Sequence, residues 1–336
     1  EIVNKYLKYL YERKLNKNSI CRKLSSIRGL YNYLTKEEIL GVNLFDNISN
    51  PKKELYLPKF LSESEINKLF EKDNGIYKME YPLNENNMQK SAQKLKDVYE
   101  KYLKGMNVYY SIIPDKNYFL TNDDHLKMDY EKIRQIVGNE LQEAKYIDIR
   151  GGLELDTYYR TDIHWRQEKL QSVADILQNN MGIESIDVKY EMEDRGDFYG
   201  SYYGQIATKV PPDTMYTLMS DTINNCAVYD VDKNKNISVY VKPDSTDKYD
   251  TFLAGSKPLI IIDNPNAKTE KELLLFRDSF GSSIAPLLIE NYSKLTLIDL
   301  RMISRQLLGD YIEFEDQDVL FLYNSLVLNN NTFQQK

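Results

Sequence analysis

One short stretch near the middle of the chain holds the residue types from which an enzyme can build a general base. It reads DTYYRTDIHWRQEKL, and it contains His164, one of only two histidines in 336 residues, and Trp165, the only tryptophan. Asp162 stands two positions before the histidine, and side chains two apart share one side of an extended segment. A carboxylate beside an imidazole fixes its tautomer and stabilises the imidazolium. We therefore predict that Asp162 orients His164 as a base.

Such a base needs a nucleophile, and Ser279 has a suitable context. It lies in LLLFRDSFG, where an apolar strand pattern turns sharply toward a helix. That turn exposes the hydroxyl and directs backbone N–H groups at an oxyanion, and Gly281 permits close substrate approach. An Asp-Ser pair after a strand is more often a helix cap, and a lone histidine is more often a core residue. In combination, the residues favour a triad of Asp162, His164 and Ser279 that forms an acyl-enzyme.

The elements that must position these residues alternate between strand and helix. Short apolar runs typical of strands buried on both faces occupy 107–113, 146–149, 259–262, 273–276, 295–298 and 319–323. Helical patterns occupy 84–103, 130–144, 282–291 and 303–308. This order predicts an α/β fold with a parallel sheet flanked by helices. Residues 186–241 are richer in glycine, aromatics and alternation, and we expect a largely antiparallel insertion there.

Bulk properties divide the chain without deciding its function. The net charge is −7, but residues 1–71 carry a net +4 and the remainder −11, an asymmetry that suggests two units with different partners. Two cysteines, Cys21 and Cys226, provide neither a disulfide framework nor metal-ligand spacing. No apolar run approaches the length of about 18 residues that a membrane span requires. We expect no membrane span, metal or cofactor.

The first unit, residues 1–71, resembles a DNA-binding module. Its runs LNKNSICRKLSSIRGLYNYL, NLFDNISNPK and LPKFLSESEINKLF are similar to the SAM-like core-binding domain of Xer-type tyrosine recombinases. The resemblance implies a small all-α four-helix domain that clasps DNA. It also places four residues near phosphates: Lys23, Ser25, Ser26 and Arg28.

Recombinase chemistry is excluded by what the chain lacks. The family needs an H-x-x-R box and a tyrosine nucleophile in a catalytic domain. Here His125 is followed by Leu-Lys-Met and His164 by Trp-Arg-Gln, so neither begins such a box. The first unit is therefore expected to be at most a DNA-binding remnant joined to another protein.

The second unit, residues 72–336, resembles a different family. The strings YYRTDIHW and RDSFG are similar to the DHHW family, SGNH-hydrolase-like proteins related to alginate O-acetyltransferases, over roughly residues 75–325. The resemblance implies an SGNH-like fold and carries the triad to Asp162, His164 and Ser279. Ile163 replaces the family's second histidine, at a position outside the triad.

The same resemblance implies a function and a location. It predicts O-acetyltransferase or esterase activity on hydroxyls of cell-surface polysaccharide or exopolysaccharide. The partners would be a polysaccharide acceptor, an acyl donor and a membrane-bound O-acyltransferase, and DNA would concern residues 1–71 alone. The location would be extracytoplasmic and associated with the cell surface, or cytoplasmic if the recombinase-like segment is authentic and no export signal is missing.

Further residues are secondary candidates for substrate or oxyanion contacts. Arg160, Tyr159 and Arg301 lie in or near the predicted site segments and offer groups that orient a sugar chain, although surface ion pairs are an equally good reading of the arginines. Gly255 and Asn264 are candidate oxyanion donors because the SGNH superfamily uses a Gly and an Asn.

Two alternatives to a serine enzyme stay open. Asp123, Asp124 and His125, together with Asp162 and His164, could form a carboxylate–imidazole metal site, although a solvated loop is the better reading of the first three. A polysaccharide-binding protein that keeps the fold without catalysis is the second alternative.

Overall fold

The structure, a computed structural model, describes residues 5–6, 13, 17–37, 39–40, 69–120, 126–184, 186–206, 209–243 and 245–334. The chain divides into two compact units, Glu1–Ser62 and Glu63–Lys336. The boundary that we predicted after Glu71 falls inside strand β1 (Leu69–Lys72), which pairs with β2 (Gly75–Lys78). The start of that hairpin therefore belongs to the second unit.

The main described element of the first unit is helix α2, Lys17–Lys36. Its Leu24 side chain is fully buried. Lys23 and Ser26 are exposed, Arg28 is half-buried, and the side chain of Ser25 lies outside the described residues. The remainder of the predicted four-helix domain falls largely outside them as well, so that fold stays a prediction.

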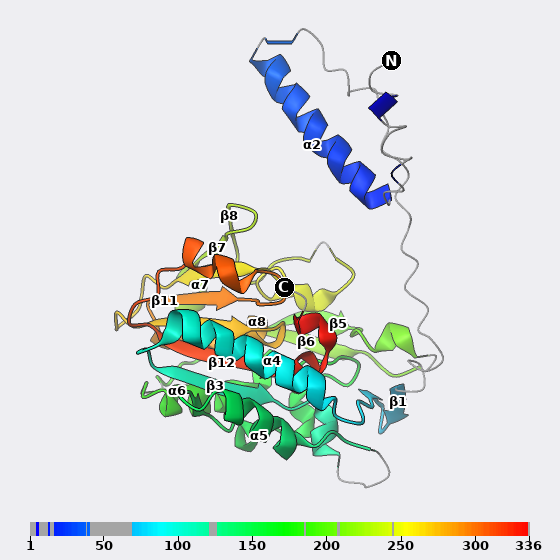
Figure 1. Cartoon of the computed structure of the whole chain (residues 1–336). Coiled ribbons are helices and arrows are strands. Elements are labelled where there is room, and N and C mark those ends of the chain that lie inside the picture. The colour runs from blue at the N-terminus through cyan, green and yellow to red at the C-terminus, as the bar shows by residue number, and fades with distance from the viewer. Residues whose placement is uncertain are drawn as a thin grey trace. The chain divides into compact units, whose positions relative to one another are not determined.

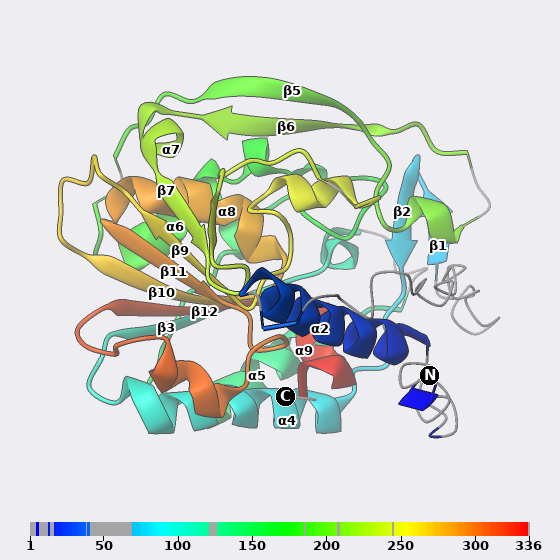
Figure 2. The ribbon, with the colours of Figure 1, turned by 90° about the horizontal axis from the view of Figure 1, so that it is seen from above.

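The second unit is built on an eight-stranded sheet in the order β4-β3-β12-β10-β11-β9-β7-β8 (Figures 1 and 2). Its strands are β3 (Val108–Ile113), β4 (Lys145–Tyr146), β7 (Ala227–Asp230), β8 (Lys235–Ile237), β9 (Leu259–Asp263), β10 (Glu272–Arg277), β11 (Lys294–Ile298) and β12 (Asp318–Asn324). From β4 to β11 every neighbouring pair is parallel. The predicted mixed α/β architecture is thus confirmed for the second unit.

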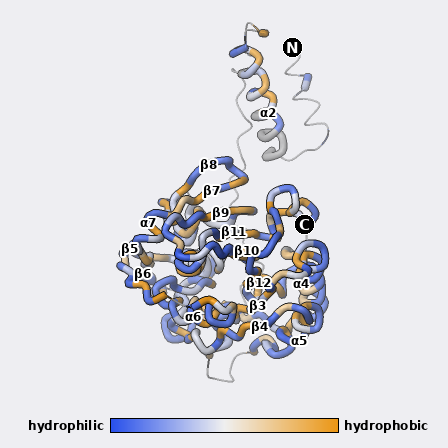
Figure 3. The backbone as a smooth tube through the Cα atoms, turned by 90° about the vertical axis from the view of Figure 1, so that its left-hand side faces the viewer, coloured by the Kyte–Doolittle hydropathy of each residue, from blue (hydrophilic) through white to orange (hydrophobic). Residues whose placement is uncertain are grey.

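Helices cover both faces of this sheet. They are α4 (Glu85–Val98), α5 (Tyr130–Glu140), α6 (Gln171–Asn180), α7 (Asp221–Asn225), α8 (Phe280–Leu288) and α9 (Ser325–Asn329). One core contains α6 and α8, and the other contains α4 and α5. Alternate residues of β10 supply the two cores, because Leu273 and Leu275 face the first and Leu274 and Phe276 face the second. Burial on both faces explains the continuous apolar run of β10. The covering helices α4 and α5, by contrast, show mixed hydropathy along their length (Figure 3).

Three details differ from the predicted arrangement. Strand β9 runs antiparallel to β11, although its apolar run looked like the parallel strands around it. The insertion supplies a separate antiparallel pair, β5 (Glu191–Phe198) and β6 (Asp213–Met219), but its other two strands join the main sheet. The predicted helix at 303–308 is a 3-10 helix, Arg305–Asp310. Periodicity identifies an apolar strand, but it does not encode the strand's direction.

The parallel strands determine where polar residues gather. Strands β3, β12 and β10 are neighbours that run in one direction, so the segments that follow them meet at one edge of the sheet. Those segments begin with Pro114, Ser325 and Asp278. No helix in the described ranges is long and apolar enough to cross a membrane.

Candidate active site

Three polar side chains meet at this edge and form a continuous hydrogen-bonded relay. Asp162 Oδ1 lies 2.5 Å from His164 Nδ1, and His164 Nε2 lies 2.7 Å from Ser279 Oγ. Asp162 is fully buried, His164 is 7% exposed, and Ser279 is partly exposed. The structure therefore brings together the three residues that we predicted from the two sequence motifs, and Ser279 is the most exposed of them.

Asp162 reaches His164 through a bend, not through the extended segment that we expected. Its Oδ1 also accepts the backbone N–H of His164 at 2.8 Å, a turn closed by an aspartate side chain, and its Oδ2 accepts the N–H of Ser201 at 2.5 Å. Burial acts to raise the pKa of Asp162, but the charge and hydrogen bonds of His164 and the Ser201 amide outweigh it and hold this pKa well below its ordinary value. Asp162 is thus an ionised acceptor.

The loop that carries Asp162 and His164 is docked onto the first turn of α8. Tyr158 and Trp165 close it as an antiparallel bridge. The indole Nε1 of Trp165 donates to Phe280 O at 3.0 Å and to Ser283 Oγ at 2.8 Å. The only tryptophan therefore links the base-carrying loop directly to the helix that follows Ser279.

Ser279 occupies the N-cap position of α8, but the capping hydrogen bond comes from the Asp278 side chain. The Asp278 carboxylate accepts the N–H of Phe280 at 3.0 Å and that of Asn324 at 2.7 Å. Burial raises the pKa of Asp278, and the nearby Arg301 charge acts against this shift. Because the capping function belongs to the aspartate, the Ser279 hydroxyl is available to His164. The helix-cap interpretation therefore applies to Asp278.

Gly281, which we predicted to permit close substrate approach, has a packing function in the structure. A Cβ at this position would lie 2.5 Å from Cβ of Arg277, so only glycine lets α8 pack against the end of β10. Its N–H donates to Asp278 O at 3.1 Å, within the turn.

Tyr249 forms one wall of the site and was not predicted. Its ring stacks on the His164 imidazole with centroids 3.8 Å apart and planes 9° apart. Its hydroxyl donates to Ser283 Oγ at 2.7 Å, and burial raises its pKa well above the ordinary value. The stacking restricts rotation of the imidazole. Nothing in the sequence distinguishes Tyr249 from the other 27 of the 28 tyrosines.

A second buried carboxylate, at the start of β6, holds the same loop. Asp213 accepts the N–H groups of Arg160 and Thr161 at 3.1 and 2.9 Å and the Thr161 hydroxyl at 2.7 Å. The Gly200 N–H in turn donates to that hydroxyl at 3.1 Å. The insertion thus contributes to the site by supporting the backbone around Asp162.

Comparison with known proteins identifies the family of this unit. The sequence profile described as DHHW protein matches residues 122–298, which is more than half of the chain. The chain belongs to the DHHW family. The matched segment contains Asp162, His164 and Ser279.

Solved structures show the same fold. A DHHW family protein from Eubacterium siraeum superposes with a TM-score of 0.66 at 19% identity, covering 79% of this chain and 93% of that one. Bacillus cereus PatB1, solved with a sulfonyl adduct, gives a TM-score of 0.61 at 17% identity, covering 80% and 98%. At such low identity these similarities establish the fold alone.

The segment that precedes the DHHW match is similar to a different protein. Tyrosine recombinase XerC of Staphylococcus saprophyticus is 42% identical over 66 residues, and XerC of Pediococcus pentosaceus is 35% identical over 96 residues. This chain spans 22% and 28% of their lengths. The predicted resemblance of the N-terminal segment to Xer-type recombinases is confirmed.

The other DHHW-unit candidates engage the protein itself. Tyr159 is fully buried in an aromatic cluster with Phe198 and Tyr249. The Arg160 guanidinium donates to Asp213 and to Pro212 O at 3.2 and 2.8 Å. Arg301 donates through Nε and Nη2 to the two oxygens of Asp299, at 2.9 and 2.6 Å. These contacts favour structural roles for all three residues. For Arg160 and Arg301 this agrees with the ion-pair interpretation.

The N–H groups of the two candidate oxyanion donors bind backbone carbonyls of the protein. Asn264 follows the antiparallel strand β9, and its N–H donates to Ser293 O at the start of β11, the opposite end of the sheet. The N–H of Gly255 donates to Phe252 O within its own turn. Asn264 is therefore not retained as an oxyanion donor, whereas the role of Gly255 stays a prediction. The metal alternative involves Asp123, Asp124 and His125, which lie outside the described residues.

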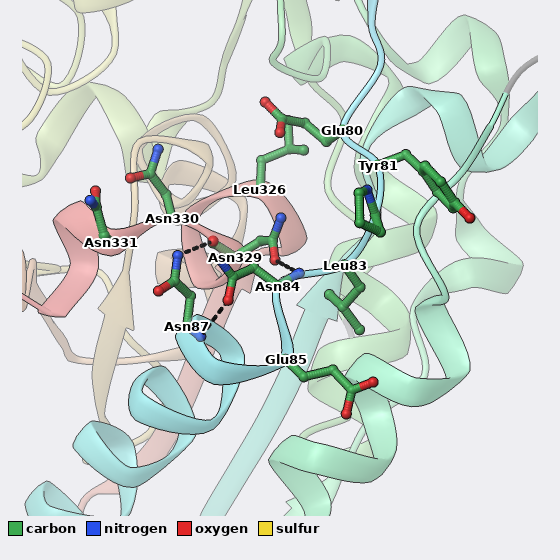
Figure 4. A pocket seen from close by; sticks show the side chains of 11 residues that line it. Glu80, Tyr81, Leu83, Asn84, Glu85, Asn87, Leu326, Asn329, Asn330 and Asn331 are labelled. Carbon is green, nitrogen blue, oxygen red and sulfur yellow. Dashed lines mark hydrogen bonds between the residues drawn. The ribbon is translucent and has the colours of Figure 1, made fainter.

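A polar hollow lies where α4 begins and α9 ends, and none of the triad residues lines it. Its labelled side chains include Asn84, Asn87 and Asn329 (Figure 4). Asn87 Nδ2 donates to Asn329 O at 3.0 Å, and Asn84 N donates to Asn329 Oδ1 at 2.8 Å. These bonds join the two helix ends and account for the asparagines structurally.

Substitution of Gly200 is expected to damage the site through the backbone. A Cβ there would lie 2.3 Å from Asp162 Cβ and 2.6 Å from Thr161 O, so Gly200→Ala must displace the Asp162 loop. We expect the free energy of unfolding to fall by about 1–3 kcal/mol, as measured by denaturant unfolding. We also expect the rate of ester hydrolysis to fall by more than the loss of folded protein would explain.

Gly204→Ala is the matched control, because nothing lies within 4 Å of a Cβ at that position. It should leave both quantities near wild type. Equal behaviour of the two variants would contradict the proposed crowding at Asp162.

Proposed function

We propose that the DHHW unit is a serine-dependent acyltransferase or esterase that acts on acetyl esters of polysaccharide hydroxyls. The observation that carries the proposal is the relay from Asp162 through His164 to Ser279, with separations of 2.5 and 2.7 Å. Its parts come from two segments that lie 115 residues apart in sequence, and the surrounding hydrogen bonds fix each of them in place.

The protonation states follow from the hydrogen bonds. An ionised Asp162 only accepts, so Nδ1 of His164 carries the proton and Nε2 accepts from the Ser279 hydroxyl. As Oγ attacks the ester carbonyl carbon, its proton moves to Nε2, and Asp162 stabilises the imidazolium. Cleavage of the ester C–O bond releases the donor alcohol, which takes that proton, and leaves an acetyl group on Ser279.

The second half reverses these steps with a new hydroxyl. A sugar hydroxyl gives transfer, whereas water gives hydrolysis; in either case the hydroxyl loses its proton to His164 as it attacks the acyl carbon. The Ser279 N–H has no hydrogen-bond acceptor in the part of the chain that the structure describes, and we assign it as a donor to the oxyanion. We propose a polysaccharide acceptor, with the acyl donor supplied by a membrane-bound O-acyltransferase, and an extracytoplasmic location.

The test is covalent modification of Ser279 by a sulfonyl fluoride, a reagent class chosen because PatB1 has been solved with a sulfonyl adduct. We expect one adduct per chain by intact mass, located on Ser279 by peptide mass, with parallel loss of acetyl-ester hydrolysis. Addition of an oligosaccharide acceptor would show transfer as an acetylated sugar. A folded protein that neither reacts at Ser279 nor cleaves acetyl esters would refute the proposal and favour the non-catalytic polysaccharide-binding alternative.

A second candidate function concerns the first unit alone, because its XerC-like segment is the basis for expecting DNA binding. Lys23 and Ser26 are three residues apart on α2 and are exposed, so they lie near one another on one helix surface. We propose that this surface contacts DNA phosphates. Binding of duplex DNA by the full chain, weakened by salt and by Lys23→Ala, is the test; absence of binding at low salt would refute it.

A further inference from the structure

A buried lysine lies directly beneath the loop that carries the triad aspartate. Lys116 follows β3 and is 4% exposed. Its Nζ donates to three backbone carbonyls of that loop: Tyr159 O at 3.0 Å, Arg160 O at 3.0 Å and Asp162 O at 2.8 Å. The mechanism above assigns this charged group no role.

The number of donors matches the number of acceptors, which indicates that Lys116 holds this loop in place. We call the three hydrogen bonds from Lys116 Nζ to the loop the clamp. An ammonium has three N–H donors, and three carbonyl oxygens converge on it. Those oxygens would repel one another in a buried space without a cation between them. The rings of Tyr77 and Tyr202 flank the ammonium at 5.0 and 5.1 Å, within range of cation–π attraction.

The charges around Lys116 act together with its hydrogen bonds. Burial lowers the pKa of Lys116 to about 7, whereas the carboxylates of Asp162, Asp213 and Asp115 act to raise it, so the ammonium with three donors is the main form of Lys116 below that pH. Asp213 binds the N–H groups of residues 160 and 161 on the same loop whose carbonyls Lys116 binds. The two side chains thus hold complementary groups of the same peptide segment.

We propose that Lys116 is a positioning residue, which fixes the peptide groups of residues 159–162 so that Asp162 and His164 stay aligned with Ser279. This inference rests on the proposed function. Lys116 is too deeply placed to contact substrate, so it acts through the loop. A displacement of the base by about 1 Å can lower the rate by about 100-fold, and loss of the clamp frees the segment that determines this placement.

Lys116→Met keeps much of the side-chain volume and removes the ammonium. We expect kcat for a small acetyl ester to fall by about 100-fold with KM within about twofold of wild type. We also expect the proton that His164 Nδ1 shares with Asp162 to lose its strongly downfield NMR resonance. Assignment is straightforward because the chain has only two histidines.

Lys94→Met is the matched control. Lys94 is also buried, at 3% exposure, and its Nζ donates to the carbonyls of Leu300 and Phe333 at 2.8 and 2.7 Å. This substitution should lower thermal stability to a similar extent while leaving kcat and the His164 resonance unchanged well below the melting temperature.

The outcomes separate the clamp from the proposed function. Equal effects of the two substitutions on kcat and on the His164 resonance would overturn the clamp, since both would then act through stability alone. A wild-type protein without esterase activity would refute the proposed function, but the NMR comparison still decides the clamp. If Lys116→Met does not fold, Lys116→Gln provides the same comparison, and an unchanged resonance in that variant would overturn the inference.

Discussion

Ser279→Ala should abolish covalent labelling by a sulfonyl fluoride and lower kcat for acetyl-ester hydrolysis by about 10⁵-fold or more. The reason is that no acyl-enzyme forms without the Oγ that lies 2.7 Å from His164 Nε2. Intact-mass spectrometry of the treated protein and release of 4-nitrophenol from its acetate measure the two effects.

Ser282→Ala is a suitable control for this experiment. Ser282 is buried in the same helix, and its hydroxyl has no hydrogen-bond partner among the described residues. Removal of an unsatisfied hydroxyl is expected to be neutral or slightly stabilising, so labelling and kcat should match wild type. Persistent labelling of Ser279→Ala at the wild-type rate would place the nucleophile elsewhere.

Asp162→Asn is expected to lower kcat by about 10⁴-fold while the protein stays folded. An asparagine amide can donate to Nδ1 of His164, and this favours the tautomer with the imidazole proton on Nε2. A protonated Nε2 cannot accept the proton of the Ser279 hydroxyl. Steady-state hydrolysis of a small acetyl ester measures the loss, with circular dichroism as the check on folding. Activity within tenfold of wild type would mean that Asp162 does not determine the tautomer.

The same substitution should alter the response of stability to acid. The pKa of Asp162 lies well below its ordinary value of 3.8 in the folded protein, so its contribution to stability is present above that value and is lost as pH falls toward the folded pKa. The unfolding free energy of wild type should therefore decrease more steeply than that of Asp162→Asn between about pH 5 and pH 2. Parallel curves would show that the aspartate is not stabilised as an anion.

Local pattern predicted much of the second unit. The strands β3, β10, β11 and β12 are continuous apolar runs because both of their faces are buried. Burial on both faces can therefore be predicted from the residue types alone. The direction of β9 was not predicted, because a buried strand has the same composition whichever way it runs. Asn264 was consequently expected at the wrong end of the sheet.

Residue order alone shows that Asp162 stands two residues before His164 and that Ser279 follows an apolar strand pattern, since both are matters of residue type and short spacing. Their meeting, the capping of α8 by the Asp278 side chain, and the contacts of Lys116, Asp213 and Tyr249 around the site become visible only in the folded chain. Each of these supporting contacts joins segments that lie far apart in the chain. Such contacts depend on how the sheet and its loops pack, and no local spacing records them.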